Sequence, residues 1–278
     1  MMMQINRNKT QSVLTTGIVA LAAASIETSE SFAALKPKAP GETKVVAIMG
    51  GDYGHNSIPL EMHVREIFSS KKNWRILFVR ASEFFTPDLI SDADLLITSR
   101  HSRPDDIGWR TDGIVESMEK GALLWTDTNA NAIVDNVRNR GMGFLALHNT
   151  IACNNNRIVD LLDIEPIPHN QVQPLWIRDL NQGHPITRGI GNFFVPLDEQ
   201  FAVVLKSDKA TILFESTAIH DKRNAVGGWC LQQGNGRIVG LLPGHTKELY
   251  QIREYQEIFW RAAHWAMKRD IPPYNHKY

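Results

Sequence analysis

Apolar runs of strand length constrain the fold of this 278-residue chain more than any other feature. They are Val45–Met49, Arg75–Val79, Leu95–Thr98, Gly143–Leu147 and Arg237–Leu242. Because these runs are apolar throughout rather than alternating, they predict strands buried on both faces, as in a parallel sheet covered by helices. Amphipathic stretches with helical spacing, Pro59–Ser69 and Tyr250–Met267, supply helices for the two faces. The order predicts an α/β fold with a doubly wound, mostly parallel sheet flanked by helices.

The middle of the chain carries weaker patterns. Residues Asp112–Asn139 could hold one helix or two, and Gly121–Asp127 could form a short strand. From Pro166 to Gln200, proline, glycine and scattered aromatic residues indicate loops and edge strands. Three further runs predict a small antiparallel extension of the sheet. They are Val203–Leu205, Thr211–Phe214 and Gly227–Leu231.

The N-terminus has the layout of a secretory signal peptide. Basic residues precede an apolar run from Val13 to Ala24, and Ser31-Phe32-Ala33 offers small residues at a cleavage site. The run is shorter than the ~20 residues of a membrane span. We therefore expect a signal peptide at 1–33, a linker at 34–43, one domain at 44–270 and a tail at 271–278, in a secreted or periplasmic protein without a membrane insertion after processing. A disordered leader or an uncleaved anchor is the alternative.

The charge and cysteine content limit the classes of partner, disulfide and metal site that we expect. Thirty basic and thirty acidic residues cancel, so no net field attracts nucleic acid, and a small neutral partner fits better. Only Cys153 and Cys230 occur, which excludes a disulfide framework and a cysteine zinc site but leaves a single bridge open. The sequence does not predict an oligomeric state.

Four predicted strands are followed within a few residues by a histidine: His55, His101, His148 and His245. Ligands of open α/β sheets bind beyond the carboxyl ends of the strands, and imidazoles bind metals and move protons near neutral pH. One such histidine alone is more often structural. Four at equivalent ends predict a functional site centred on His148.

Glycines and acidic residues add to this prediction. The segment from Gly50 to His55 lets the backbone approach a ligand closely, with Gly51 and Asp52 as contacts, but it lacks the spacing of a dinucleotide fingerprint, so no nucleotide is expected. The pair Asp198-Glu199 is either solvated or directed at the histidines. In the second case Glu199 is a candidate metal ligand or general acid/base.

Several ordered blocks resemble the ThuA-like (trehalose utilisation) family over about Val45 to Lys268. They are Gly141-Met142-Gly143-Phe144-Leu145-Ala146-Leu147-His148, Gly183-His184-Pro185-Ile186-Thr187-Arg188-Gly189-Ile190, Asp198-Glu199-Gln200-Phe201, Trp229 with Gly234-Asn235-Gly236-Arg237-Ile238-Val239, and Gly244-His245. This sequence departs from the family pattern where Met142 interrupts a glycine run and where Phe201 replaces a tyrosine.

The resemblance implies a class I glutamine amidotransferase-like, or flavodoxin-like, fold. His148 is similar in position to the nucleophilic cysteine of those enzymes, and His245 with Glu248 is similar to their histidine and glutamate. Without the nucleophile, amidotransferase activity is not expected, and Cys153 lies too far along the chain to substitute.

The resemblance also implies carbohydrate metabolism, with hydrolysis or elimination of glycosides or 3-keto-glycosides. In this hypothesis His148, His184 and His245, with Glu199, hold a divalent metal such as zinc, and His55 or His101 moves protons. The expected substrate contacts are Gly51, Asp52, Asn149, Asp198 and Trp229.

Two alternatives remain at this point. In the first, a non-catalytic sugar-binding or accessory module uses the same polar groups with Trp109, Trp176 or Trp229. In the second, the histidines are structural and the protein is a scaffold.

Overall fold

A computed structural model describes residues 36–49, 58–68, 71–80, 82–101 and 124–274. The predicted signal peptide lies outside these ranges, as do Gly51, Asp52, His55 and Trp109. Lys38–Tyr278 form one compact unit. In the described part of this unit, no helix is long and apolar enough to cross a membrane.

Nine strands of the described residues form one sheet in the order β2-β1-β3-β4-β11-β10-β9-β6-β7. The parallel half consists of β1 (Thr43–Ile48), β2 (Trp74–Val79), β3 (Leu95–Thr98), β4 (Gly143–Leu147) and β11 (Gly236–Leu241). Every residue of β1, β3 and β4 is buried. The prediction from uniformly apolar runs is confirmed for these three strands, because such runs suit strands that are covered on both faces. It is wrong for most of β2, which lies at the edge of the sheet and is only partly buried before Val79.

The antiparallel half consists of β6 (Gln173–Arg178), β7 (Phe193–Asp198), β9 (Thr211–Ala218) and β10 (Asn224–Gln233). Two more strands, β5 (Ile164–Ile167) and β8 (Ala202–Leu205), pair with each other in a separate sheet. The predicted extension is therefore larger than expected, and its first run, β8, lies outside the main sheet. The edge strands predicted between Pro166 and Gln200 are β6 and β7.

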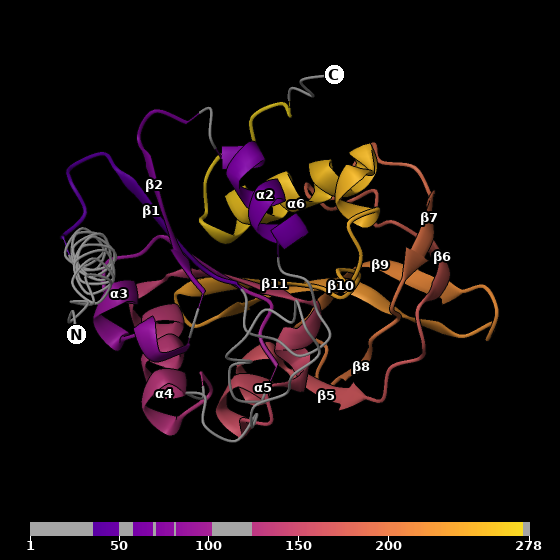
Figure 1. Ribbon diagram of the computed structural model, residues 1–278, viewed down its shortest axis with the longest axis horizontal. Helices are drawn as coiled ribbons and strands as arrows, with labels where there is room; N and C mark the ends of the chain where they lie inside the picture. The colour runs from indigo at the N-terminus through magenta and orange to yellow at the C-terminus, as the bar shows by residue number, and fades with distance from the viewer. Residues whose placement is uncertain (1–35, 50–57, 69–70, 81, 102–123, 275–278) are drawn as a thin grey trace, which may run out of the picture. The chain divides into compact units, whose positions relative to one another are not determined.

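Helices cover both faces of the parallel half (Figure 1). On one face lie α2 (Ile58–Phe68), α6 (Arg253–Ala266) and the short η4 (Leu249–Gln251); on the other lie α3 (Pro87–Ile90), α4 (Asp127–Asp135), the π-helical η2 (Asn136–Arg140) and α5 (Asn156–Leu162). Short 3-10 turns follow β2 and β4 as η1 (Ser82–Phe84) and η3 (His148–Ala152).

Alternate residues of each central strand point to opposite helical layers. Val45, Leu145 and Val239 belong to the core cluster that contains α2 and α6. Their neighbours Val46 and Phe144 are equally buried but face the other layer. Within the predicted segment at 112–139, the described residues form α4 and the π-helical η2 that continues it, and residues 124–126 are not a strand as predicted.

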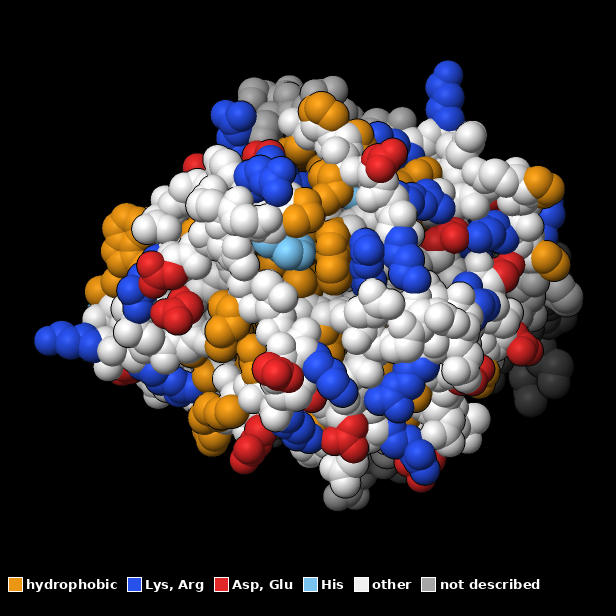
Figure 2. Space-filling model, turned by 180° about the vertical axis from the view of Figure 1, so that it is seen from behind, with side chains coloured by type: hydrophobic (Ala, Val, Ile, Leu, Met, Phe, Trp, Pro, Cys, Tyr) orange, Lys and Arg blue, Asp and Glu red, His pale blue; other side chains and the backbone are white. Residues whose placement is uncertain are grey.

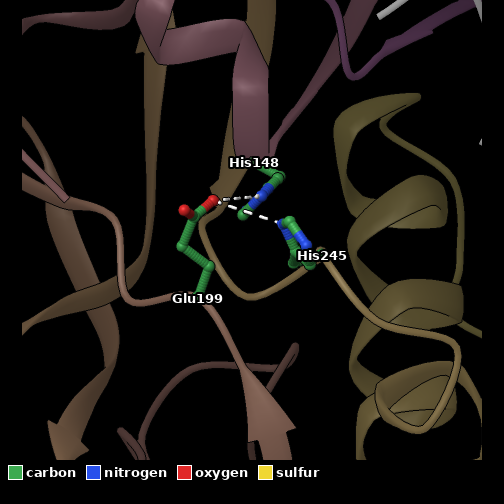
Figure 3. Close-up of side chains that lie close together, drawn as sticks. All are labelled: His148, Glu199 and His245. Atoms are coloured by element: carbon green, nitrogen blue, oxygen red, sulfur yellow. Dashed lines mark ion pairs between the residues drawn. The ribbon is translucent and has the colours of Figure 1, made fainter. Parts of the chain in front are cut away.

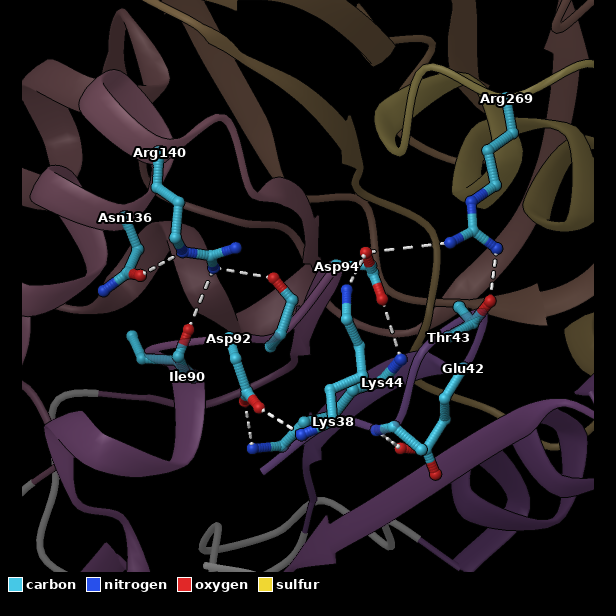
Figure 4. A network of polar contacts seen from close by, with 12 residues as sticks. Lys38, Glu42, Thr43, Lys44, Ile90, Asp92, Asp94, Asn136, Arg140 and Arg269 are labelled. Carbon is cyan, nitrogen blue, oxygen red and sulfur yellow. Dashed lines mark hydrogen bonds and ion pairs between the residues drawn. The ribbon is translucent and has the colours of Figure 1, made fainter. Parts of the chain in front are cut away.

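A polar network joins the amino ends of the strands, away from the predicted site (Figure 4). The ammonium of Lys44 is buried and lies 2.5 Å from Oδ1 of Asp92, while the Lys38 ammonium lies 2.8 Å from Oδ1 of Asp94. Asp94 also accepts a backbone hydrogen bond from Lys44 at 2.8 Å. These contacts hold Lys38 against the fold, so the second half of the predicted linker at 34–43 belongs to the compact unit.

The C-terminal segment packs along α6 as far as Tyr274. The indole of Trp260 donates a hydrogen bond to the Pro272 carbonyl at 3.0 Å, and the Tyr274 ring lies 5.9 Å from the Trp260 ring. Residues 271–274 of the predicted tail therefore pack against the domain.

His63 of α2 is a polar residue inside the core. Its ring packs on Tyr250 at 5.2 Å and on Phe259 at 4.8 Å, and neither ring nitrogen has a hydrogen-bond partner. Burial lowers the pKa of His63 to about 3 from an ordinary value of 6.5. Since only the unfolded chain takes up this proton between those values, the folded state loses stability as the pH falls from 6.5 toward 3.

We predict that His63→Leu removes this acid sensitivity. The wild-type free energy of unfolding should fall below pH 6.5 by up to about 1.4 kcal/mol per pH unit more than that of the variant. Urea denaturation at intervals from pH 7 to pH 4 measures both slopes. Leu60→Met, a volume-conserving change on the same buried side of α2, should keep the wild-type slope. Equal slopes in wild type and His63→Leu would contradict the prediction.

Candidate functional site

His148 lies at the turn where β4 ends and η3 begins. Its backbone has φ 37°, in the left-handed region that non-glycine residues seldom adopt, and its residue surface is fully buried. Such strain persists only where surrounding contacts enforce it, and it concentrates at functional sites. A close approach by the β11 loop is one such contact, because a Cβ on Gly244 would lie 2.8 Å from the His148 Cβ.

The strand pairing explains why His148 meets this loop. Leu147 of β4 is paired with Leu241 of β11, so the residues that follow them leave the sheet side by side. Nδ1 of His148 lies 2.8 Å from the Leu242 carbonyl oxygen. Since a carbonyl only accepts, Nδ1 must carry the proton, which directs Nε2 of the ring toward the site.

Two buried tyrosines fix the loop after β11 from the other side. The Tyr255 hydroxyl donates to the Pro243 carbonyl at 2.7 Å, and the Tyr250 hydroxyl donates to the Gly244 carbonyl at 2.8 Å. Burial raises the pKa of both tyrosines well above the ordinary value, so both hydroxyls keep their protons. The segment that carries His245 is therefore held from η4 and α6.

Asp198, the last residue of β7, joins this loop to the antiparallel half of the sheet. Its Oδ1 accepts from three backbone amides: Glu199 at 2.7 Å, His245 at 3.0 Å and Gly244 at 3.3 Å. Burial raises the pKa of this carboxyl, while the neighbouring His148 and the amides act in the opposite direction. Asp198 has no exposed surface, so it positions the site rather than contacting a substrate as predicted.

Glu199 lies between two of the predicted histidines (Figure 3). Its Oε2 is 3.3 Å from Nε2 of His148 and 3.3 Å from Nδ1 of His245. One potential ligand atom from each residue lies within 4.8 Å of the other two. The side chains are 1%, 9% and 22% exposed for His148, Glu199 and His245, so the cluster opens to solvent on the His245 side.

A further histidine, His169, was missed by the sequence analysis. Its Nδ1 lies 2.7 Å from Oε1 of Glu199, and its side chain is 50% exposed. It belongs to the loop between β5 and β6, and no strand pattern distinguished it from the other histidines. Phe201 lines both rings, with centroids 4.5 Å from His148 and 4.7 Å from His169.

Three other predicted site residues, His184, Trp229 and Asn149, lie outside the cluster or are fully buried. His184 packs 5.3 Å from the Trp265 ring, and its Nε2 lies 3.4 Å from the Cys230 sulfur, so it is not a member of the ligand group. Trp229 is a core residue that donates to the Leu162 carbonyl at 3.2 Å. Asn149 follows His148 in η3 and is fully buried.

Of the remaining predicted site residues, His101 alone lies within the described part of the chain. His101 is half-buried three residues beyond β3, and its carbonyl accepts from the Trp125 indole at 3.1 Å. His55, Gly51 and Asp52 lie outside the described residues. The two cysteines are free thiols, which answers the open question of a bridge between them.

The cluster has the donor set of a divalent-metal site. Two imidazoles and one carboxylate suit zinc or a similar first-row ion. Nδ1 of His148 already donates to a backbone carbonyl, which is the second bond that orients metal-binding histidines in proteins. His148, Glu199 and His245 could therefore hold such an ion, and of the predicted ligand set His184 alone lies outside the group.

The fold and the site together define an α/β protein with a histidine-rich site at the carboxyl edge of a parallel sheet. The family model described as trehalose utilisation (ThuA) matches residues 44–266. The chain belongs to this family, which confirms the resemblance seen in the sequence blocks. The family's link with trehalose utilisation points to carbohydrate metabolism.

Solved structures of low sequence identity share the fold. A ThuA-like protein from Parabacteroides merdae ATCC 43184 has a TM-score of 0.65 and 15% identity, covering 85% of this chain and 94% of its own. A ThuA-like protein from Bacteroides uniformis ATCC 8492 has a TM-score of 0.61 and 13% identity, with 83% and 93% covered.

A cold-adapted β-galactosidase from Rahnella sp. R3 is also similar in fold. Its TM-score is 0.53 at 14% identity, and the match covers 83% of this chain but 32% of the galactosidase. No curated protein matches the sequence.

We predict that Asp198→Ala lowers the free energy of unfolding by at least about 1–3 kcal/mol, because buried backbone donors lose their acceptor. Asp198→Asn keeps an acceptor oxygen and should retain most of the stability that the Ala variant loses. Since burial raises the pKa of Asp198, wild-type stability should fall as the pH rises through that pKa, whereas the Asn variant should lack this decline. Denaturant unfolding at intervals from pH 4 upward tests both points, because the decline begins above the ordinary carboxyl pKa of 3.8. Equal stability of the Ala and Asn variants would exclude the clamping role.

Proposed function

We propose that this protein is an exported enzyme of carbohydrate metabolism that cleaves glycosides or 3-keto-glycosides, using a divalent metal held by His148, Glu199 and His245. The observation that carries the proposal is the approach of two imidazole nitrogens to one carboxylate oxygen, each at 3.3 Å, at the carboxyl edge of the sheet. Ligands of open α/β sheets bind at this edge.

A bound divalent ion would supply Lewis-acid polarisation of a substrate oxygen, such as the ketone of a 3-keto-sugar. The chain's own residues prepare the site for it. The Leu242 carbonyl fixes the His148 ring, and Asp198 fixes the backbone of both Glu199 and His245. These contacts hold the donors in place before any ligand arrives, so little reorganisation is needed on binding.

Elimination followed by hydration accounts for net hydrolysis of a 3-keto-glycoside. A base removes the proton from C2, beside the ketone, as the bond from C1 to the leaving oxygen breaks and the aglycone takes up a proton. Water then adds at C1 and a proton returns to C2. Proton transfer of this kind requires a group near neutral pKa within reach of the sugar. We assign this transfer to His101 or His55, with Glu199 as the alternative if it is not a ligand.

We propose that the fold is related to that of class I glutamine amidotransferases, but we do not propose amidotransferase activity. His148 occupies the strand-to-helix turn where such an enzyme needs a cysteine. Cys153 is buried, and burial raises the pKa of its thiol to about 11, so it remains protonated at neutral pH. A buried thiol is a poor nucleophile.

A sugar-binding module without turnover is the second candidate. The observation that favours it is an aromatic surface on β6 and β7, where Trp176 and Phe194 are 44% and 45% exposed and their rings lie 5.5 Å apart. Figure 2, seen from behind, shows hydrophobic side chains gathered on the flank where β6 and β7 lie. Exposed aromatic rings offer an apolar face to a ligand.

The metal assignment predicts one tightly bound zinc per chain. Zinc affinity, measured by competition with a chromogenic chelator, should fall in Glu199→Gln and His245→Ala by more than the roughly 10–100-fold that loss of an outer-shell partner causes. His184→Ala is the matched control and should retain the affinity, because His184 lies outside the cluster. Unchanged zinc affinity in Glu199→Gln would contradict the assignment.

The enzymatic assignment predicts release of monosaccharide from a 3-keto-disaccharide, lost on chelation and restored by zinc. Chromatography of the reaction mixture measures release, and calorimetry with the same sugar measures binding. Release that persists in a verified metal-free preparation would refute the metal's role. Sugar binding without release, abolished by Trp176→Ala, would favour the binding module.

A further inference from the structure

We infer that His169 is a positioning residue for Glu199, holding its carboxylate so that Oε2 lies between His148 and His245. The consequence for zinc binding rests on the proposed function, whereas the geometry of the contact does not. The contact from Nδ1 of His169 to Oε1 of Glu199 is 2.7 Å, shorter than both contacts to Oε2 at 3.3 Å. Two oxygens of one carboxylate thus have separate partners on opposite sides.

The carboxylate needs such a holder because a glutamate side chain has three rotatable bonds. Ordering it costs up to about 1.5–2 kcal/mol of conformational entropy. Asp198 holds the backbone amide of Glu199 and does not act on its side-chain torsions. The contact of Nδ1 of His169 with Oε1 constrains these torsions and directs Oε2 at the two other histidines.

Hydrogen bonds hold the two neighbours of His169 in place, and Nδ1 of His169 itself also lies 3.1 Å from the Asn170 carbonyl oxygen. The Arg223 guanidinium donates from Nη1 to the Pro168 carbonyl at 3.0 Å and to the Asn170 side-chain oxygen at 2.7 Å, on either side of His169. The amide of Asn170 donates to the Gln200 carbonyl at 3.3 Å. The Gln200 side chain in turn donates to the Arg223 carbonyl at 3.0 Å. These bonds link the His169 loop, the residues after β7 and the start of β10 in a closed ring.

The exposure of His169 agrees with an outer role. Its side chain is 50% exposed, whereas those of His148 and Glu199 are 1% and 9% exposed, so His169 lies nearer the solvent than the residues it supports. Packing against Phe201 keeps the ring over the carboxylate. Among the described residues, the group of ligand atoms within 4.8 Å of one another contains His148, Glu199 and His245 but not His169. His169 therefore supports the group from outside.

Three substitutions at one position test the inference. His169→Ala removes the donor and should weaken zinc binding by about 10–100-fold. His169→Asn places an amide nitrogen where Nδ1 lies and should restore most of the affinity. His169→Gln places its nitrogen one bond farther out and should not. His220→Ala, at an exposed histidine of the turn between β9 and β10, is the matched control and should leave the affinity unchanged.

A second measurement separates this inference from the proposed function. In crystal structures of the metal-free variants, the Glu199 carboxylate should leave its position between His148 and His245 in His169→Ala and keep it in His169→Asn. If wild type binds no zinc, the proposed metal role fails while these structures still decide the positioning role. An unmoved carboxylate in His169→Ala, or zinc affinity equal to that of wild type, would overturn the inference.

Discussion

The site depends on the hydrogen bonds of Asp198, which join the end of β7 to the loop after β11. In strand order β10, β9 and β6 separate β11 from β7, which in a flat sheet would set β7 about 19 Å from β11. Yet the Asp198 carboxylate at the end of β7 accepts from the amides of Gly244 and His245 beyond β11. The bend of the antiparallel half and the reach of the loop after β11 together bring these groups into contact. One buried carboxylate oxygen of Asp198, with three backbone amide donors, links the end of β7 to the loop after β11.

The bend has a local origin in β10. Its pairing with β9 is irregular between Val226 and Trp229, and irregular pairing of this kind bends and twists a strand. Gly227 and Gly228 occupy this place, where a Cβ on either would come within 2.7 Å of the Phe214 ring. The absence of side chains lets Phe214 pack against the bend. Two glycines that carry no chemistry thus help to bring Glu199 to the histidines.

The parallel half and two of the site residues could be predicted from the sequence because the determining patterns are local. Uniformly apolar runs identify buried strands, and position after such strands identifies His148 and His245. Glu199 was a candidate from its acidic pair and from a family block, but neither signal decided whether it faces the histidines or the solvent. Its approach depends on the bend of the antiparallel half, which no periodicity encodes.

The errors have the same physical origin. His184 was grouped with the ligands because its block resembles the family, yet the fold turns it toward Trp265 and Cys230. Trp229 has the residue type of a sugar contact, but it fills a space over Gly240, where a Cβ would come within 2.3 Å of the indole. His169 reaches Glu199 only because Arg223, far along the chain, fixes its loop. Contacts between distant segments decided each of these cases.

Because β7 lies at the edge of the sheet, the local stability around Glu199 is lower than that around His148. Opening β4 breaks a ladder with β3 and another with β11, whereas opening the end of β7 breaks its one ladder with β6 and the two hydrogen bonds of Asp198 to Gly244 and His245. Subglobal opening follows the elements with the fewest contacts, so the end of β7 can detach while the parallel half stays folded. In amide exchange, the residues around Glu199 would then belong to a less protected unit than those around His148. The cluster would come apart from the carboxylate side, well before the protein unfolds.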